Sequence, residues 1–290
     1  MRKYISNDAV FLITGCSSGF GKSMAEYVAK LGFNLVATAR DVNTLNYLGN
    51  SENILCLELD ITNLDSIQKA IKSAVSKFGK IDVLINNAGI NYLTTINNLE
   101  QDKMRLLFET NIIGIINMTK EALPYIPDNN NSAIVNLSSM SGLDTGWDVI
   151  LYGMSKHAVN GLTQAIKSTK HCQVRTMSVN PGKFASNMRK NSLENPNVNK
   201  EEAVKRYLAQ EFQGDINVAA KDIINFVVYR KKLPMYMILG HRSIRRFRRL
   251  IRSMRKDYKT CKRLSINKGG TKKYILRMLK RIFIRPFTRS

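Results

Sequence analysis

Short apolar runs alternate with helical patterns over most of the chain. The runs are rich in Val, Ile and Leu, and most of them stop at a Gly, Asp or Asn, as strands of a buried sheet do. We expect strands at 10–14, 34–39, 54–59, 81–85, 133–137, 174–179 and 233–240. Between them, apolar residues recur at helical spacing over 24–31, 67–78 and 100–123 and around 152–156. This alternation predicts an α/β fold, a doubly wound parallel sheet with helices on both faces and a ligand crevice at the carboxyl ends of its strands.

The first predicted strand ends at a glycine-rich turn. Thr14 is followed by Gly15, Gly19 and Gly21 before a helical pattern begins. Glycines allow a tight turn and the close approach of a ligand, and the free N–H groups at a helix start favour a pyrophosphate. The sequence therefore predicts a Rossmann-like dinucleotide site, although the spacing Gly-x-x-x-Gly-x-Gly departs from the common Gly-x-Gly-x-x-Gly.

The ends of the next strands carry candidate cofactor ligands. The second strand ends at Ala39 and Arg40, where dinucleotide folds often place an acidic residue on the adenosine ribose. A guanidinium suits a 2′-phosphate instead, so this ending favours NADP(H) over NAD(H). The alternative is an arginine that only meets solvent. Asp60 and Asn87 fall at the ends of the third and fourth strands, on the edge that holds the crevice.

Tyr152 and Lys156 lie four residues apart in a predicted helix, so their side chains share one face. A phenol with an ordinary pKa of about 10 exchanges protons poorly near neutrality unless a nearby cation stabilises the phenolate. Lys156 is placed to be that cation. The same spacing also fits an exposed aromatic stem and a solvated charge. Asn111, an amide within an apolar stretch, is either a structural bridge or part of a site.

With these segments in order, residues 8–240 resemble the classical short-chain dehydrogenase/reductase (SDR) family. Each motif is weak alone, but their joint order and spacing are specific. The motifs are Thr14-Gly-x-x-x-Gly-x-Gly21, Asn86-Asn-Ala-Gly89, Asn111, Ser139 thirteen residues before Tyr152, Tyr152-x-x-x-Lys156 and Pro181-Gly182. The Ala39-Arg40 ending is similar to the NADP-preferring branch that includes hydroxysteroid and retinol dehydrogenases.

The resemblance implies four catalytic residues. Tyr152 would be the general acid/base, and Lys156 would lower its pKa and hold the nicotinamide ribose. Ser139 would orient the substrate oxygen, and Asn111 would support a proton-relay water. The implied cofactor site comprises Gly15, Ser17, Ser18, Gly19, Phe20, Gly21, Arg40, Asp60, Ile61, Asn87, Ala88, Gly89, Tyr152, Lys156, Pro181 and Gly182. The expected reaction is hydride transfer between NADP(H) and a carbonyl or secondary alcohol, without a metal, in a homodimer or homotetramer.

Residues 183–214 correspond to the family's variable substrate lid. Its apolar residues would suit a hydrophobic or lipid-linked substrate, or they pack as helix faces on the sheet. These residues are Met188, Tyr207, Leu208 and Phe212. Ser186 stands where the family usually has a threonine that contacts the nicotinamide amide, and it keeps the hydroxyl.

The net charge of +23 is concentrated at one end of the chain. Residues 1–229 carry 23 Lys and Arg against 21 Asp and Glu, whereas residues 230–290 carry 22 against Asp257 alone. We therefore expect a near-neutral catalytic domain at 1–240 and a basic tail at 241–290, with a polyanionic partner for the tail.

The tail has two amphipathic patterns, over 244–258 and 272–285, separated by a break at 267–270. Each combines a narrow apolar stripe with a cationic face, so we hypothesise that the tail docks on the cytoplasmic face of an anionic membrane. Packing on the core is one alternative. Nucleic acid is another, less favoured because the tail lacks a recognised binding motif.

The remaining composition narrows the compartment and the chemistry. Cys16, Cys56, Cys172 and Cys261 form no CxxC pair and no metal-ligand spacing, which fits a reduced cytoplasmic compartment. The apolar run at 10–13 is too short for a secretory signal, and no run is long enough to span a bilayer.

Two other functions stay open. One is a non-catalytic membrane- or nucleic-acid-binding protein that keeps the fold. The other is a sugar-nucleotide epimerase or dehydratase, which the compact glycine turn makes less favoured.

Overall fold

A parallel sheet forms the centre of the protein, seen in a computed structural model that describes residues 3–146, 148–169, 173–186, 188, 192–193, 205, 212 and 214–264. In this part of the chain the sheet has seven strands in the order β3-β2-β1-β4-β5-β6-β7. They are β1 (Val10–Ile13), β2 (Asn34–Ala39), β3 (Ile54–Glu58), β4 (Val83–Asn86), β5 (Ala133–Leu137), β6 (Arg175–Pro181) and β7 (Tyr236–Leu239). The predicted strands are confirmed, with ends that differ by at most three residues.

Helices connect the strands. They are α1 (Gly19–Lys30), α2 (Leu64–Phe78), α3 (Gln101–Phe108), α4 (Gly114–Ala122), α5 (Ile150–Ser168), α7 (Ile216–Tyr229) and α8 (His241–Leu264). The shorter turns are η1 (Val42–Leu48), η2 (Ile96–Asn98), η4 (Leu123–Tyr125) and η5 (Met140–Gly142). The helix predicted over 100–123 is interrupted by a π-helical turn, η3 (Glu109–Ile113), which separates α3 from α4.

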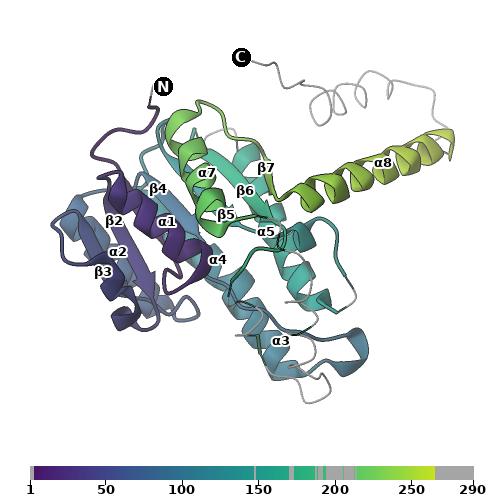
Figure 1. Cartoon of the computed structure of the whole chain (residues 1–290), viewed down its shortest axis with the longest axis horizontal. Coiled ribbons are helices and arrows are strands. Elements are labelled where there is room, and N and C mark those ends of the chain that lie inside the picture. The colour runs from purple at the N-terminus through teal and green to yellow at the C-terminus, as the bar shows by residue number, and fades with distance from the viewer. Residues whose placement is uncertain are drawn as a thin grey trace. The chain divides into compact units, whose positions relative to one another are not determined.

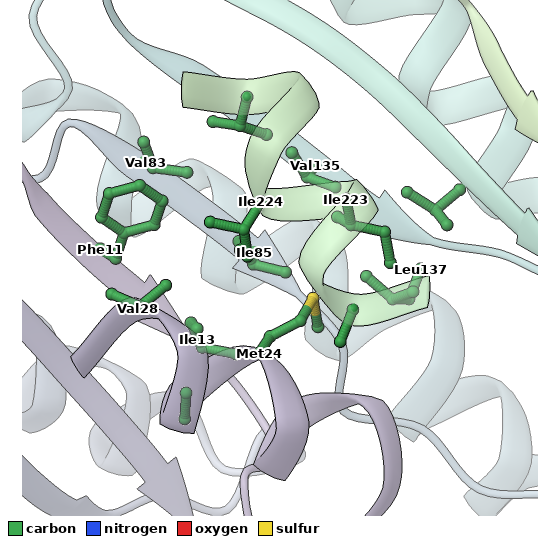
Figure 2. Close-up of a cluster of buried hydrophobic side chains, with 14 of the residues drawn as sticks. Phe11, Ile13, Met24, Val28, Val83, Ile85, Val135, Leu137, Ile223 and Ile224 are labelled. Atoms are coloured by element: carbon green, nitrogen blue, oxygen red, sulfur yellow. The ribbon is translucent and has the colours of Figure 1, made fainter. Parts of the chain in front are cut away.

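The core has two layers, one on each face of the sheet. Helices α1 and α7 pack together over one face, where their apolar residues meet those of the central strands (Figures 1 and 2). Met24 of α1 and Ile224 of α7, for example, lie over Ile13 and Ile85 of the sheet in Figure 2. Helices α2, α4 and α5 contribute to the second cluster, on the opposite face. Strands β1, β4 and β5 are buried along their whole length, which explains why their sequences are apolar except at Asn86 and Asn136.

The connections change direction at β1, which places the expected crevice. Phe11 of β1 pairs in parallel with Leu35 of β2 on one side and with Val83 of β4 on the other. The chain therefore proceeds from β1 to one edge of the sheet and then returns to build the other edge, as in a doubly wound fold. Ligands of such sheets bind outside the carboxyl ends of the strands at this point. The predicted fold class is confirmed.

The chain divides into two compact units, the first ending at Phe247 and the second beginning at Arg248. The boundary lies inside α8, which contains the helix predicted over 244–258. The second amphipathic pattern, at 272–285, lies outside the described residues. Among the described helices, none has a stretch apolar and long enough to cross a bilayer.

Candidate active site

The glycine turn after β1 has the backbone shape that its sequence predicts. Gly15 and Gly19 have φ angles of 71° and 60°, a region that side chains disfavour. A Cβ on Gly21 would lie 2.2 Å from the Gly15 carbonyl oxygen and 2.5 Å from Asn87 Nδ2. The turn is thus closed so tightly that only glycine fits at position 21.

Asn87 and Thr14 hold this turn against the end of β4. The Asn87 Nδ2 group donates to the carbonyl oxygens of Thr14 and Gly15, at 2.8 and 2.9 Å. The Thr14 hydroxyl oxygen accepts from the backbone N–H groups of Asn87 and Ala88, both at 3.0 Å. The four bonds fix the two strand ends relative to each other, so Asn87 shapes the site as well as facing it.

A cavity of about 350 Å³ opens at this edge of the sheet. It brings together most of the residues proposed for cofactor binding: Gly15, Ser17, Ser18, Gly19, Phe20, Arg40, Asp60, Ile61, Asn87, Ala88 and Gly89. It is also lined by Ala39, Leu59, Thr62, Ile90, Leu106, Thr110, Ser186, Met188 and Leu193. The glycine cradle and the polar strand ends fit a dinucleotide, because backbone N–H groups at the start of α1 can face a pyrophosphate.

Two charged side chains border the cavity beyond the glycine turn. Arg40, directly after β2, is exposed to solvent. The Asp60 carboxylate, after β3, accepts hydrogen bonds from the backbone N–H and the hydroxyl of Thr62, at 2.9 and 2.7 Å. These bonds hold the Asp60 carboxylate in place, whereas the Arg40 guanidinium is available to an anionic ligand.

Tyr152 and Lys156 lie one turn apart on α5, as predicted. Lys156 is only 1% exposed, and its Nζ donates to the carbonyl oxygen of Leu137, 2.8 Å away at the end of β5. The same Nζ lies 5.7 Å from the centroid of the Tyr152 ring. Burial lowers the pKa of Lys156 to about 8. At pH 7 this site therefore still holds a largely protonated, desolvated ammonium beside the phenol.

The Tyr152 hydroxyl contacts a residue of the cavity wall. It donates to Met188 Sδ at 3.5 Å, and Met188 is one of the residues that line the cavity. The ring is half-buried. The phenol is therefore linked to the cavity wall through Met188.

Asn111, in the π-helical turn, bridges the segment after β4 to α5. Its Oδ1 accepts from the backbone N–H of Ile90, and its Nδ2 donates to the Ile90 carbonyl oxygen, both at 2.9 Å. Nδ2 also donates to the Ser155 hydroxyl at 3.0 Å, which in turn donates to the Tyr152 carbonyl oxygen. The side chain therefore acts as a structural bridge beside the site, and the proton-relay role stays a prediction.

Gly89 lies between the cavity and the buried polar side chains of Asn111 and Lys156. A Cβ on this residue would lie 3.2 Å from Asn111 Oδ1 and 3.4 Å from Lys156 Nζ. Because Gly89 itself lines the cavity, the ammonium and the amide lie just behind the wall.

Other predicted site residues, like Asn111, Tyr152 and Lys156, do not line this cavity. Ser139 follows β5 and accepts a hydrogen bond from the Ser141 N–H through its hydroxyl oxygen, at 3.1 Å. Pro181 ends β6, and the N–H of Gly182 donates to the Leu239 carbonyl oxygen at 2.9 Å. Gly21 contributes by letting the turn close. In the proposed lid, Tyr207 and Leu208 lie outside the described residues.

Several lining residues were not predicted. Ile90 directly follows the Asn-Asn-Ala-Gly motif, and Thr62 follows Asp60, so proximity to a motif was a usable signal for both. Leu106, Thr110 and Leu193 carry no local signal, because only the tertiary fold brings their elements to the cavity. Within the described residues, no cluster of three or more His, Cys, Asp or Glu side chains could hold a metal ion.

The profile of the short chain dehydrogenase family matches residues 9–197. The chain therefore belongs to the short-chain dehydrogenase family. The match includes the glycine turn, the Asn-Asn-Ala-Gly segment and the Tyr152/Lys156 helix.

Curated relatives are similar over the same region. Dehydrogenase/reductase SDR family member 7 of Homo sapiens is 33% identical over 197 residues, covering 64% of this chain and 58% of that protein. A 3-ketodihydrosphingosine reductase of Bacteroides thetaiotaomicron is 32% identical over 176 residues, covering 60% of this chain and 64% of the relative. Both matches span less than two thirds of the relative's own length. Because both names denote oxidoreductases, the non-catalytic alternative gains no support.

Solved structures share the fold. A short-chain dehydrogenase from Streptomyces avermitilis superposes with a TM-score of 0.78 at 26% identity, covering 89% of this chain and 98% of its own. ElxO, solved with NADP bound, has a TM-score of 0.67 at 28% identity, covering 80% of this chain and 97% of its own.

Proposed function

We propose that the protein is an NADP(H)-dependent oxidoreductase that interconverts a carbonyl and a secondary alcohol. The observation that carries the proposal is the contact of the Tyr152 hydroxyl with Met188, a residue that lines the cavity, together with the buried Lys156 ammonium one helical turn away. This pair can hold and release a proton at the edge of a dinucleotide site. When bound, the nicotinamide supplies hydride or accepts it.

Tyr152 is the proposed general acid/base. In the reducing direction its hydroxyl protonates the oxygen of the carbonyl as that oxygen gains negative charge, and in the oxidising direction its phenolate removes the alcohol proton. The ammonium of Lys156 favours the phenolate through charge attraction, which is strengthened because Lys156 is screened from water. The Ser139 hydroxyl, at the same edge of the sheet, would hold the substrate oxygen.

The cofactor preference rests on Arg40. Its exposed guanidinium borders the cavity where β2 ends, the position that in dinucleotide folds faces the adenosine ribose. A planar guanidinium can bind a 2′-phosphate through two parallel hydrogen bonds. ElxO, which has a similar fold, was solved with NADP bound, and this supports the same cofactor for the present protein.

The proposed substrate is an apolar or lipid-linked ketone or alcohol. The cavity is lined in part by Ile90, Leu106, Met188 and Leu193. Met188 contacts the Tyr152 hydroxyl, and Leu106 is 44% exposed. Apolar side chains that face a cavity favour an apolar ligand. The name of the Bacteroides relative, 3-ketodihydrosphingosine reductase, supports a ketone. We further propose a homo-oligomer in the cytoplasm, on the basis of the family and the cysteine pattern.

Cofactor titration followed by a substrate screen tests the proposal. NADPH and NADH are titrated by fluorescence, and a panel of ketones of increasing chain length is then screened for NADPH oxidation. We expect NADPH to bind at least about tenfold more tightly than NADH, since a charged hydrogen-bonded contact is worth about 1.5–3 kcal/mol. Equal affinities would contradict the cofactor assignment, and failure to bind either dinucleotide would contradict the function as a whole.

A further inference from the structure

Helix α8 has two distinct faces along its 24 residues. One face carries an apolar stripe that recurs every three or four residues: Ile244, Phe247, Leu250, Ile251, Met254 and Tyr258. The rest of the helix holds eleven Lys and Arg residues, and Asp257 is its one acidic residue. Such a pattern is typical of helices that lie on a charged surface and not of helices that cross a bilayer.

The first turns of α8 are attached to the catalytic unit. The Arg246 guanidinium donates hydrogen bonds to the carboxylate and to the backbone carbonyl oxygen of Asp144. The ring of Phe247 packs edge-on to Tyr236 of β7, with 6.5 Å between ring centroids. Phe247 therefore has a structural role in this unit.

From Arg248 onward the cationic side chains are exposed, among them Arg248, Arg249 and Arg252. In the apolar stripe Met254 is 52% exposed, and the others are half-buried: Leu250, Ile251 and Tyr258. A partly exposed apolar stripe flanked by arginines on a helix of this charge suits a partner that is both anionic and apolar.

We propose that the second part of α8, from Arg248 to Lys262, binds the surface of a membrane rich in anionic phospholipid. In this arrangement the arginines contact lipid phosphates, and Leu250, Ile251 and Met254 enter the boundary between headgroups and acyl chains. Nucleic acid is the other polyanion, but phosphate contacts need no apolar stripe. The proposal does not depend on the enzymatic assignment.

Vesicle binding by the full chain tests the charge requirement. We expect sedimentation with vesicles of 70% phosphatidylcholine and 30% phosphatidylglycerol, binding at least about tenfold weaker to pure phosphatidylcholine, and weakening as salt rises. Equal binding to both vesicles, or none to either, would overturn the proposal.

Charge reversal tests whether α8 itself, or only the net charge of the protein, drives binding to vesicles. The double variant Arg249→Glu/Arg252→Glu should bind anionic vesicles at least about tenfold more weakly than the natural sequence. Lys69→Glu/Lys72→Glu is the matched control, because it changes the net charge equally at exposed positions of α2. Equal losses in the two variants would show that net charge alone drives binding, and would overturn the assignment to α8.

Replacement of two apolar-stripe residues by serine tests whether α8 binds lipid or nucleic acid. Met254→Ser/Tyr258→Ser keeps every charge, so it should weaken vesicle binding several-fold while leaving binding to a 20-base-pair DNA duplex unchanged. Circular dichroism verifies that the variant keeps its helix content. If this variant binds vesicles as well as the natural sequence does, or if the natural sequence prefers the duplex, the membrane proposal is wrong.

Discussion

The ammonium nitrogen of Lys156 lies 2.8 Å from the carbonyl oxygen of Leu137, which ties the helix that carries Tyr152 to the end of β5. The partner is a neutral carbonyl, so the bond replaces only part of the hydration that the charge loses on burial. This deficit lowers the pKa of Lys156 to about 8. The buried charge near Tyr152 therefore lowers the free energy of unfolding of the protein.

The first prediction concerns Lys156→Met and the pH dependence of unfolding. Between pH 8 and about 10.4 the unfolded chain keeps the Lys156 proton while the folded protein releases it, so the stability of the natural sequence gains up to about 3 kcal/mol as pH rises through this window. Lys156→Met removes this gain and is at least as stable as the natural sequence at pH 7. Urea unfolding at pH 7, 8, 9 and 10 measures both. A stability difference between the two proteins that stays constant over this range would contradict the assignment.

A second prediction concerns Arg40→Ala. Without the guanidinium, NADPH affinity should fall by about 10- to 100-fold, whereas NADH affinity should change less than about twofold, since NADH has no 2′-phosphate. Lys69→Ala, at an exposed position of α2, is the control for the loss of one positive charge. Equal weakening of both cofactors by Arg40→Ala would place the arginine outside the 2′-phosphate site.

A third prediction concerns Gly21→Ala. The added methyl group would lie 2.2 Å from the Gly15 carbonyl oxygen, so the turn must open. We expect a loss of about 1–3 kcal/mol in unfolding free energy and weaker NADPH binding. Gly161→Ala on α5 is the matched control, because no heavy atom lies within 4 Å of its added Cβ and alanine favours a helix. Similar behaviour of the two variants would show that the tight turn does not shape the cofactor site.

A fourth prediction concerns Asn111→Ala. This change leaves the N–H and carbonyl groups of Ile90 without their Asn111 partners beside a buried site. Since each unsatisfied buried polar group costs about 1–3 kcal/mol, we expect a loss of about 2–4 kcal/mol in unfolding free energy. Chemical denaturation measures it. If stability is unchanged while turnover falls, the role of Asn111 is in proton transfer and not in bridging.

The strands and the glycine turn could be predicted because their signals are local. A buried parallel strand is apolar at nearly every position, as in β5, where Asn136 is the one polar residue. The turn at Gly15 needs a glycine for its own backbone angles. The arrangement of Tyr152 and Lys156 follows from helical spacing alone. Their environment does not: the burial of Lys156 and its bond to Leu137 depend on how α5 packs on the sheet.

The missed features depend on contacts between distant segments. Helix α7 is rich in Ile and Val, whose local preference is for strands, yet it forms a helix capped by Asp215 and packed on α1. The π-helical turn at Asn111 coincides with hydrogen bonds to Ile90, which lies 21 positions earlier. Likewise, the contact between Met188 and Tyr152 joins a residue of the proposed lid to α5, and no motif in the sequence indicates it.

The proposed reaction depends most on Tyr152 as the group that exchanges a proton with the substrate. The direct test is the turnover number for NADPH oxidation with a ketone from the screen, compared between the natural sequence and Tyr152→Phe, with NADPH affinity measured on both. We predict that Tyr152→Phe lowers kcat by at least about 100-fold, the usual contribution of a general acid, and changes the NADPH dissociation constant less than about twofold. A Tyr152→Phe variant that reduces the ketone at the rate of the natural sequence would contradict the role of Tyr152 as the general acid/base.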